Sequence, residues 1–436
     1  MPRTLMHLIL ALVAPSTGLA AQTVIVDKKG GGNFTEIADA VAKVSSGAVI
    51  RVRFYSGYLP FTLTNKSVTI IGEKDSRTGL YPRIWIPKIR NNTNRLTIGA
   101  LAASHRVVFR NIALSVNAYM IGPPILVKDC KGAVVFENVE FNGGLNTFFN
   151  VDVTDCPNVH FSNCTFGGRA TASKNNYVLL AWRSQISLSN STITGRAASS
   201  SAIIPGSVGL LARASRVVAA GTQITGGKGG SAIFDGSDGG AAVVLQSGST
   251  LVATGTKPNL FTGGGGGCGG LGKNANGGTG IVLTGGSMAR IEGFAPAGGT
   301  PCPGGGKAGA PFTTDATSKL TLNPKSLPAL ARMTGAVTPG STLNFWLDAR
   351  PNSSALMILG QRPVWVDMGP AVVGILLARP DIVLGLPKVP AGGSLKVPVA
   401  LPKTLPRGLT GFVQFASQEP GPGTVWGTNL LVVTVE

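Results

Sequence analysis

A short strand motif that ends in asparagine and recurs at a nearly fixed interval constrains this chain of 436 residues more than any other feature. Four segments align without gaps: 109–112, 136–139, 161–164 and 188–191. Their asparagines, Asn111, Asn138, Asn163 and Asn190, are 27, 25 and 27 residues apart. A fixed period of about 20–50 residues is typical of solenoids, propellers and arrays.

The period equals the length of one turn of a parallel β-helix, with three short strands and three bends. Successive turns stack about 4.8 Å apart, so an asparagine at the same bend in each turn would form a ladder of side-chain amides. The pattern continues in segments 215–221, 249–255 and 287–293 with glycine at the bend and longer intervals. Residues 221–310 hold 30 of the 61 glycines. We therefore expect the later turns to carry long glycine-rich loops.

Cysteine spacing agrees with stacked turns. Cys130 and Cys156 are 26 residues apart, and Cys268 and Cys302 are 34 apart, in each case the length of one turn. Adjacent turns bring Cα atoms within the range of about 4.4–6.8 Å that a disulfide requires. The spacing predicts two disulfides, Cys130–Cys156 and Cys268–Cys302, and leaves Cys164 as a free, buried thiol.

The two ends of the chain differ from its centre. Residues 1–21 have a positive start, an apolar run and a small-residue exit, which is typical of a signal peptide and predicts a secreted or cell-surface protein. No later stretch qualifies as a transmembrane segment. Residues 320–436 hold 14 of the 28 prolines between short apolar runs, and we expect a C-terminal β-sandwich there.

A single helix is expected near the start of the mature chain, over residues 35–44. Ile37, Ala40, Val41 and Val44 fall on one face of a helix, and Thr35 is a plausible N-cap.

Residues 22–73 resemble the opening of the pectin methylesterase and pectate-lyase-like superfamily. The matching residues are Val24-Ile25-Val26-Asp27, Gly30-Gly31-Gly32-Asn33-Phe34-Thr35-Glu36-Ile37, Ala40-Val41, Gly57-Tyr58 and Lys66-Ser67-Val68-Thr69-Ile70-Ile71-Gly72. The resemblance implies a right-handed, single-stranded parallel β-helix whose N-terminal end is capped by the 35–44 helix. The expected fold is thus all-β, with this β-helix over residues 22–319 followed by a small antiparallel β-sandwich. The catalytic motifs of the esterases and polygalacturonases are missing, so the resemblance implies a fold and not an activity.

Acidic residues are scarce where a β-helix enzyme would need them. The chain carries 38 Lys and Arg against 19 Asp and Glu, and residues 76–128 and 156–234 contain no carboxylate. A glycoside hydrolase needs paired carboxylates, and a calcium-dependent lyase needs an acidic cluster. Asp152, Asp155, His105 and His160 are expected at solvent-exposed or bend positions. The sequence predicts no metal site and no cofactor.

Basic residues give the clearest indication of a binding surface. In a solenoid, residues spaced by one turn lie on one face, and Arg183 and Arg213 are 30 residues apart with Trp182 beside Arg183. A surface of Arg169, Trp182, Arg183 and Arg213 would suit an anionic polysaccharide or another cell-envelope component. The export signal and the lack of a known nucleic-acid-binding module argue against a nucleic acid partner.

Three functions follow from these features. The leading one is a non-catalytic extracellular or cell-surface protein that binds acidic polysaccharide, because charge by itself argues for association. The second is a metal-independent polysaccharide lyase, in which Lys174 or Arg183 removes a proton and Tyr177 protonates the leaving oxygen. The third is a purely structural envelope or adhesion protein whose glycine-rich loops face a partner.

Overall fold

The structure is a computed structural model of the whole chain. It describes residues 22–435 apart from 87–94, 117–122, 144–149, 169–176, 199–203, 232–234, 258–259, 271–273, 362, 368–371, 374, 379, 406–408 and 421–423. The predicted signal peptide lies outside the described residues. Two compact units are present, one made mainly of residues 24–326 and the other mainly of residues from 327 onward.

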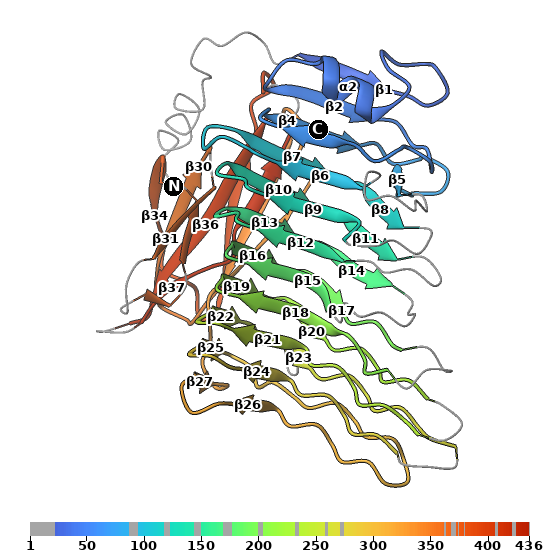
Figure 1. The fold of residues 1–436 in the computed structure, drawn as a ribbon. Helices are drawn as coiled ribbons and strands as arrows, with labels where there is room; N and C mark the ends of the chain where they lie inside the picture. The colour runs from blue at the N-terminus through green and yellow to red at the C-terminus, as the bar shows by residue number, and fades with distance from the viewer. Residues whose placement is uncertain are drawn as a thin grey trace. The chain divides into compact units, whose positions relative to one another are not determined.

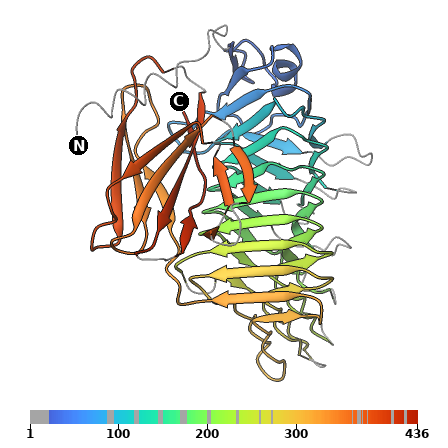
Figure 2. The same ribbon diagram turned by 90° about the vertical axis from the view of Figure 1, so that its left-hand side faces the viewer.

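Three long sheets run along the first unit, and we call them sheets A, B and C (Figures 1 and 2). Sheet A contains β1 (Thr23–Val26), β2 (Ala48–Val52), β4 (Val68–Gly72), β7 (Arg106–Arg110), β10 (Ala133–Glu137), β13 (Val159–Ser162), β16 (Gln185–Ser189), β19 (Arg216–Ala220), β22 (Thr250–Thr254), β25 (Met288–Glu292) and β27 (Lys319–Asn323). Sheet B contains β5 (Arg83–Ile86), β8 (Ala113–Val116), β11 (Glu140–Gly143), β14 (Thr165–Gly168), β17 (Thr192–Thr194), β20 (Gln223–Thr225) and β23 (Phe261–Thr262). Sheet C contains β3 (Thr62–Thr64), β6 (Leu96–Gly99), β9 (Ile125–Lys128), β12 (Val151–Thr154), β15 (Tyr177–Trp182), β18 (Val208–Arg213), β21 (Val243–Gln246), β24 (Ile281–Leu283) and β26 (Phe312–Thr314).

Each coil visits the sheets in the order A, B, C before the chain returns to sheet A. The strands β10, β11 and β12 form one such coil, and β13 begins the next in parallel register with β10. The predicted parallel β-helix is confirmed. Its last rung, β27, extends beyond the expected boundary at residue 319.

Aromatic side chains fill the interior of the middle coils. Phe109, Phe136 and Phe161 occupy the same register position in sheet A, and their stacked rings have centroids 5.3 and 5.1 Å apart. Phe141 and Phe166 stack in the same way in sheet B, at 4.4 Å. All five side chains are buried. The repeated phenylalanine of the sequence motif is therefore the core-filling residue of each coil.

The repeated asparagines sit at the bend between sheets A and B. Asn111, Asn138, Asn163 and Asn190 have φ of 56°, 51°, 53° and 48°, a left-handed conformation that asparagine tolerates better than most residues. The Nδ2 of Asn138 donates to the Oδ1 of Asn111 at 2.7 Å, which forms one rung of an amide ladder. These side chains are half-buried or exposed rather than internal, so their main role is to permit the bend.

The single helix, α2 (Ile37–Lys43), lies within the predicted range 35–44 and buries Ile37, Ala40 and Val41. Its N-cap is Glu36, not Thr35 as expected, because Glu36 is the last residue with an extended backbone. In the described part of the chain, no helix has the length and hydrophobicity that crossing a bilayer requires.

The described glycine-rich segments between residues 195 and 311 are ordered by hydrogen bonds and are not loose loops. Segments that leave sheet B bond to the equivalent segment of the next coil at every third residue: Gly226 N–H donates to Thr262 O, and Gly229 N–H donates to Gly265 O. Segments that return to sheet C follow the same rule. A repeat of three residues per turn is the period of polyproline II.

The outgoing and returning segments also bond to each other. The N–H of Gly240 donates to Gly227 O, that of Gly264 to Gly240 O, and that of Gly278 to Gly264 O, at 2.7–2.8 Å. A Cβ atom placed on Gly264 would lie 1.9 Å from Gly227 O, so only glycine fits there. We call these segments (195–198, 204–207, 226–230, 235–242, 263–270, 274–280 and 297–311) the glycine stack.

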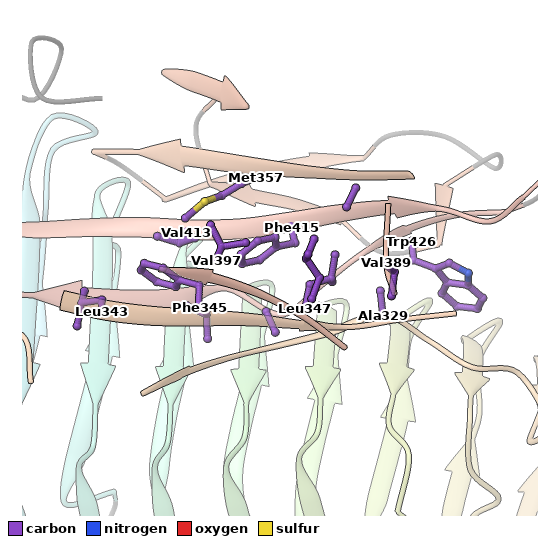
Figure 3. Close-up of a cluster of buried hydrophobic side chains, with 14 of the residues drawn as sticks. Ala329, Leu343, Phe345, Leu347, Met357, Val389, Val397, Val413, Phe415 and Trp426 are labelled. Atoms are coloured by element: carbon purple, nitrogen blue, oxygen red, sulfur yellow. The ribbon is translucent and has the colours of Figure 1, made fainter. Parts of the chain in front are cut away.

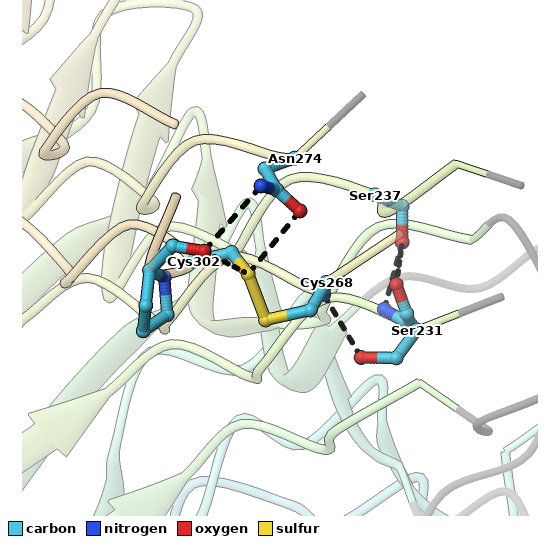
Figure 4. Close-up of a disulfide and its surroundings, with 7 residues drawn as sticks. Ser231, Ser237, Cys268, Asn274 and Cys302 are labelled. Atoms are coloured by element: carbon cyan, nitrogen blue, oxygen red, sulfur yellow. Dashed lines mark hydrogen bonds between the residues drawn. A yellow bond between two sulfur atoms is a disulfide. The ribbon is translucent and has the colours of Figure 1, made fainter. Parts of the chain in front are cut away.

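One predicted disulfide is present and the other is not. Cys268 and Cys302 are bonded, with Cα atoms 5.3 Å apart, and they join two successive coils of the glycine stack (Figure 4). Cys130 and Cys156 remain free thiols, so the prediction of a bridge between them is wrong. Each donates to a carbonyl of its own strand, Cys156 to Thr154 O at 3.1 Å and Cys130 to Lys128 O at 3.3 Å. Cys164 is free and buried, as predicted.

The second unit is a small antiparallel sandwich. One sheet contains β28 (Leu330–Thr334), β29 (Thr342–Asp348) and β35 (Ser394–Ala400). The other contains β32 (Val372–Val373), β37 (Val425–Gly427), β36 (Thr410–Gln418), β30 (Ser354–Gly360) and β34 (Ile382–Leu386), with β38 (Leu431–Thr434) paired to β36, and β31 (Pro363–Asp367) forms a separate pair with β33 (Ile375–Ala378). Buried side chains from both larger sheets, including Phe345, Leu347, Met357 and Phe415, form its core (Figure 3).

Candidate functional site

A row of outward-facing side chains crosses the C-terminal ends of five strands of sheet C. Register places Lys128, Thr154, Trp182, Arg213 and Gln246 side by side on successive coils. We call this set the Trp182 row. Trp182 is 44% exposed, which is unusual for so large an apolar side chain, and Lys128 and Arg213 are exposed as well. The Nε of Arg213 donates to the Oε1 of Gln246 at 2.8 Å.

The bend that follows each of these strands carries its own charged residues. Asp155 and Arg183 occupy equivalent left-handed positions on neighbouring coils, with φ of 54° and 48°. Arg183 makes a bidentate ion pair with Asp155, with both N–O distances at 2.6 Å. Its guanidinium carbon also lies 4.5 Å from the ring centre of Trp182. Arg183 therefore orients the indole ring, and its own charge is already paired.

Electrostatics agree with this assignment. The Arg183 guanidinium lowers the pKa of the Asp155 carboxyl, and the same pair raises the pKa of Arg183. Within the part of the chain that the structure describes, Lys128 and Arg213, on either side of Trp182, form no ion pair. Of the predicted binding residues, Trp182, Arg183 and Arg213 are brought together, whereas Arg169 lies outside the described residues.

The predicted catalytic residues are not brought together in the same way. Tyr177 is the first residue of β15 and Arg183 follows its last residue, so their Cα atoms lie roughly 20 Å apart along the strand. The Tyr177 hydroxyl bonds to Asp152, which is in register with Leu180 near the middle of β15. Lys174 lies outside the described residues.

A second polar cluster surrounds Tyr177 at the opposite end of the strand. The Tyr177 hydroxyl donates to Asp152 Oδ2 at 3.2 Å. Arg196 donates from Nη2 to Asn150 Oδ1 and to the Tyr177 carbonyl oxygen, the latter at 2.9 Å. Asn150 and Arg196 are buried. The cluster joins three successive coils through side chains.

Burial dominates the titration of this cluster. It raises the pKa of Asp152 to about 6, raises that of Tyr177, and lowers that of Arg196 to about 10. Asp152 Oδ1, Asn150 Nδ2 and Arg196 Nε are buried and find no hydrogen-bond partner among the described residues. A tyrosine with a raised pKa stays protonated, so Tyr177 can donate a proton but is a poor base.

Sequence reasoning missed most of this cluster. Asp152 was expected at a solvent or bend position, but it is half-buried against Tyr177. Asn150 and Arg196 carried no signal, because they flank strands as ordinary polar residues. The one available clue was that Arg196 stands at the start of a glycine-rich segment, where a long side chain can cover neighbouring coils.

The two histidines also differ from expectation. His160 is buried, not exposed: one ring nitrogen bonds to Ser187 Oγ at 2.6 Å and the other to Asn158 Oδ1 at 2.5 Å. Burial lowers its pKa to about 3, so the ring is neutral. His105 is half-buried, just before β7. Within the described ranges, no three His, Cys, Asp or Glu side chains gather closely enough to hold a metal ion.

A scan against models of known protein families finds no match to this chain, and a search of curated proteins finds none either.

Proposed function

We propose that this chain is an extracellular, non-catalytic protein that binds an acidic polysaccharide across the Trp182 row. The observation that carries the proposal is an exposed tryptophan in one register row with two exposed basic side chains, neither of which forms an ion pair with a described residue. Aromatic rings offer a flat apolar face to a sugar ring, and basic groups pair with carboxylate or sulfate substituents.

The spacing of the row suits a polymer rather than a single sugar. Lys128 and Arg213 are separated by three coil steps, or about 14 Å at the usual interstrand spacing. A chain of acidic sugars lying along the solenoid would meet Lys128, Trp182 and Arg213 in turn. The ring of Trp182 is prepared for this contact by its stack with Arg183, which reduces the entropy lost on binding.

Two further features support an extracellular setting. The N-terminal segment has the composition of a signal peptide, and the Cys268–Cys302 disulfide is of the kind that persists in oxidising compartments. The resemblance of residues 22–73 to pectate-lyase-like proteins is an analogy of fold, and it agrees with a carbohydrate ligand.

The proposal is tested by retention of the mature protein on immobilised uronate and sulfated polysaccharides at rising salt. We expect Trp182→Ala and Arg213→Ala to weaken binding, the former by about tenfold or more, because truncating a central aromatic anchor costs about 2 kcal/mol. Lys228→Ala, which removes an exposed charge from the glycine stack, is the matched control and should retain binding. Equal retention of all three variants would refute the proposed row.

The same incubations distinguish the lyase alternative. Cleavage by β-elimination creates an unsaturated product that absorbs in the ultraviolet, so absorbance growth would make the protein an enzyme. Growth that is lost in Tyr177→Phe would assign the chemistry to the cluster at the other end of β15. Salt-sensitive retention without absorbance growth is the result that we expect.

A further inference from the structure

The first and last strands of sheet A differ in how the backbone groups at their outer edges are hydrogen-bonded. At the N-terminal end, the outer edge of β1 is covered by its own chain. Asn33 N–H donates to Ile25 O at 2.7 Å, Asp27 N–H donates to Phe34 O at 2.9 Å, and Ile25 N–H donates to Asn33 Oδ1 at 2.8 Å. Such covering removes the unpaired backbone groups that make a sheet edge a template for association.

At the C-terminal end, β27 is the last strand of sheet A. Lys319 N–H donates to Ser287 O, and Asn323 O accepts from Gly293 N–H, so the odd-numbered residues of β27 face β25. In a parallel ladder, the backbone groups of alternate residues point to opposite sides. Leu320 and Leu322 therefore direct their N–H and C=O groups to the outer side, where none of the described strands pairs with β27.

The core is also less well covered at this end. Leu320 and Leu322 are in register with Ala289 and Ile291 of β25, which are buried. Both leucines are only half-buried, while the alternate residues of β27 are exposed. A regular strand with free backbone groups and partly exposed core leucines is a surface suited to the addition of another strand.

We propose that β27 pairs with β27 of a second copy of this chain, antiparallel and about a two-fold axis through Thr321. The segment Lys319-Leu320-Thr321-Leu322-Asn323 is nearly symmetric about its central residue. In this pairing, leucine lies opposite leucine and Lys319 lies opposite Asn323 of the second copy. No like charges face each other.

The direction of the backbone groups of β27 agrees with the same two-fold axis. An antiparallel pair alternates between residues that exchange two hydrogen bonds and residues that exchange none. With Thr321 on the axis as a non-bonded pair, Leu320 and Leu322 fall in bonded pairs, and these are the residues whose backbone groups are directed outward. A pairing shifted by one residue would need the backbone groups of Thr321, which already face β25. The direction of the backbone groups and the side-chain pattern together favour this antiparallel pairing about Thr321.

The test is sedimentation of the mature, disulfide-bonded protein over a range of concentrations. We expect a dimer whose dissociation constant rises at least tenfold in Thr321→Lys and in Thr321→Glu, because like charges meet on the axis. A one-to-one mixture of the two variants should restore the dimer, since lysine then faces glutamate. Gln223→Lys adds the same charge to an exposed position of β20 in sheet B and should leave the dimer intact.

Thr321 is exposed, so its replacement is not expected to disturb folding, and circular dichroism checks this directly. A wild-type chain that stays monomeric would overturn the inference. So would a dimer that Thr321→Lys leaves unchanged, since this would place the interface elsewhere. Recovery of the dimer in the mixed sample separates a pairing effect from any loss of folding in either single variant.

Discussion

The coils of residues 106–194 and the coils of residues 195–311 form one continuous β-helix, but they are held together differently. In the first set, which we call the aromatic coils, phenylalanine rings stack in the interior at 4.4–5.3 Å. In the second set, which we call the glycine coils, the amides of the glycine stack bond to carbonyls in two directions, and most of its glycines leave no room for a Cβ atom.

The difference shows that a solenoid can propagate its register by two physical means. Apolar side chains stabilise a stack through burial, at about 25 cal/mol per Å² of apolar surface. Glycine segments bury little such surface, and their stability depends on satisfying every backbone group in a closely packed array. The first mechanism tolerates similar side chains, whereas the second tolerates only glycine at its internal positions.

The largest expected effect comes from breaking the aromatic stack. Phe136 is fully buried between Phe109 and Phe161, so Phe136→Ala should cost about 3–5 kcal/mol of unfolding free energy through lost burial and a residual cavity. Thermal or denaturant unfolding measures it. Hydrogen exchange should accelerate first in the aromatic coils, because repeat units depend most on their neighbours.

The control for this substitution lies on β26, just after the glycine coils. Phe312 on β26 is 42% exposed, and Phe312→Ala should change stability by less than about 0.5 kcal/mol. If both substitutions had the same effect, the aromatic stack would not be the source of stability that the packing indicates.

The next effect concerns one added methyl group in the glycine coils. A Cβ on Gly264 would lie 1.9 Å from Gly227 O, so Gly264→Ala must displace backbone and should cost about 3 kcal/mol. Gly265→Ala is the matched control, because the nearest atom to its Cβ is the Thr300 hydroxyl oxygen at 3.4 Å. Similar stabilities of the two variants, measured by unfolding, would contradict the close packing of the outgoing and returning segments of the glycine stack.

The two sets of coils also differ in how far their structure could be predicted from the sequence. The phenylalanine and asparagine repeat predicted the coils, since burial and left-handed bends depend on side chains that can be read directly. The glycine stack was mistaken for loops, because glycine has no side chain to signal burial. A visible clue was the Gly-Gly-x period at 226–231 and 263–268. The buried cluster around Asp152 was missed because its partners, Tyr177 and Arg196, lie on other coils.

Removing the disulfide should have a somewhat smaller effect that is confined to the glycine coils. Cys268 and Cys302 are 34 residues apart, and the variant with both replaced by alanine should lose about 2–3 kcal/mol. Hydrogen exchange should accelerate near residues 263–311 and remain unchanged near residues 106–194. A uniform acceleration along the β-helix would mean that the two sets of coils unfold as a single unit.

Acidity should act on the aromatic coils through Asp152, whose side chain is half-buried against Tyr177. Burial raises the pKa of Asp152 to about 6, whereas an unfolded carboxyl titrates near 4, so the folded state holds this proton more tightly. Asp152 therefore opposes folding above pH 6, and this penalty of about 2–3 kcal/mol disappears as the pH falls through 6 toward 4. Asp152→Asn removes that part of the pH dependence.

The comparison must be made between variant and wild type at each pH, because His160 acts in the opposite direction. Its pKa is lowered to about 3, so the unfolded state takes up a proton first as the pH falls below about 6.5. A stability difference between Asp152→Asn and wild type that is the same at pH 4 and pH 7 would show that Asp152 titrates normally.

The smallest effects are expected at the bends, where the two sets of coils use the same backbone conformation with different residues. Asn163 has φ of 53° and donates its N–H to Ser189 O, and Gly221 has φ of 60° and donates to Thr254 O. Asn163→Ala should cost about 1 kcal/mol, because alanine is disfavoured in the left-handed region. Asn163→Gly should be nearly neutral, since glycine adopts this conformation without a Cβ penalty.

The reverse exchange tests the equivalent bend of the glycine coils, at Gly221. In Gly221→Asn, the new Cβ would meet the Oδ1 of Asn190 at 2.6 Å, an atom at the end of a side chain that can rotate away. The Asn190 amide could then bond to the new one, as Asn138 does to Asn111. Both exchanges should therefore change the unfolding free energy by less than about 1 kcal/mol, which chemical denaturation can measure. A large loss in Gly221→Asn alone would mean that the requirement for glycine extends from the stack to the bends.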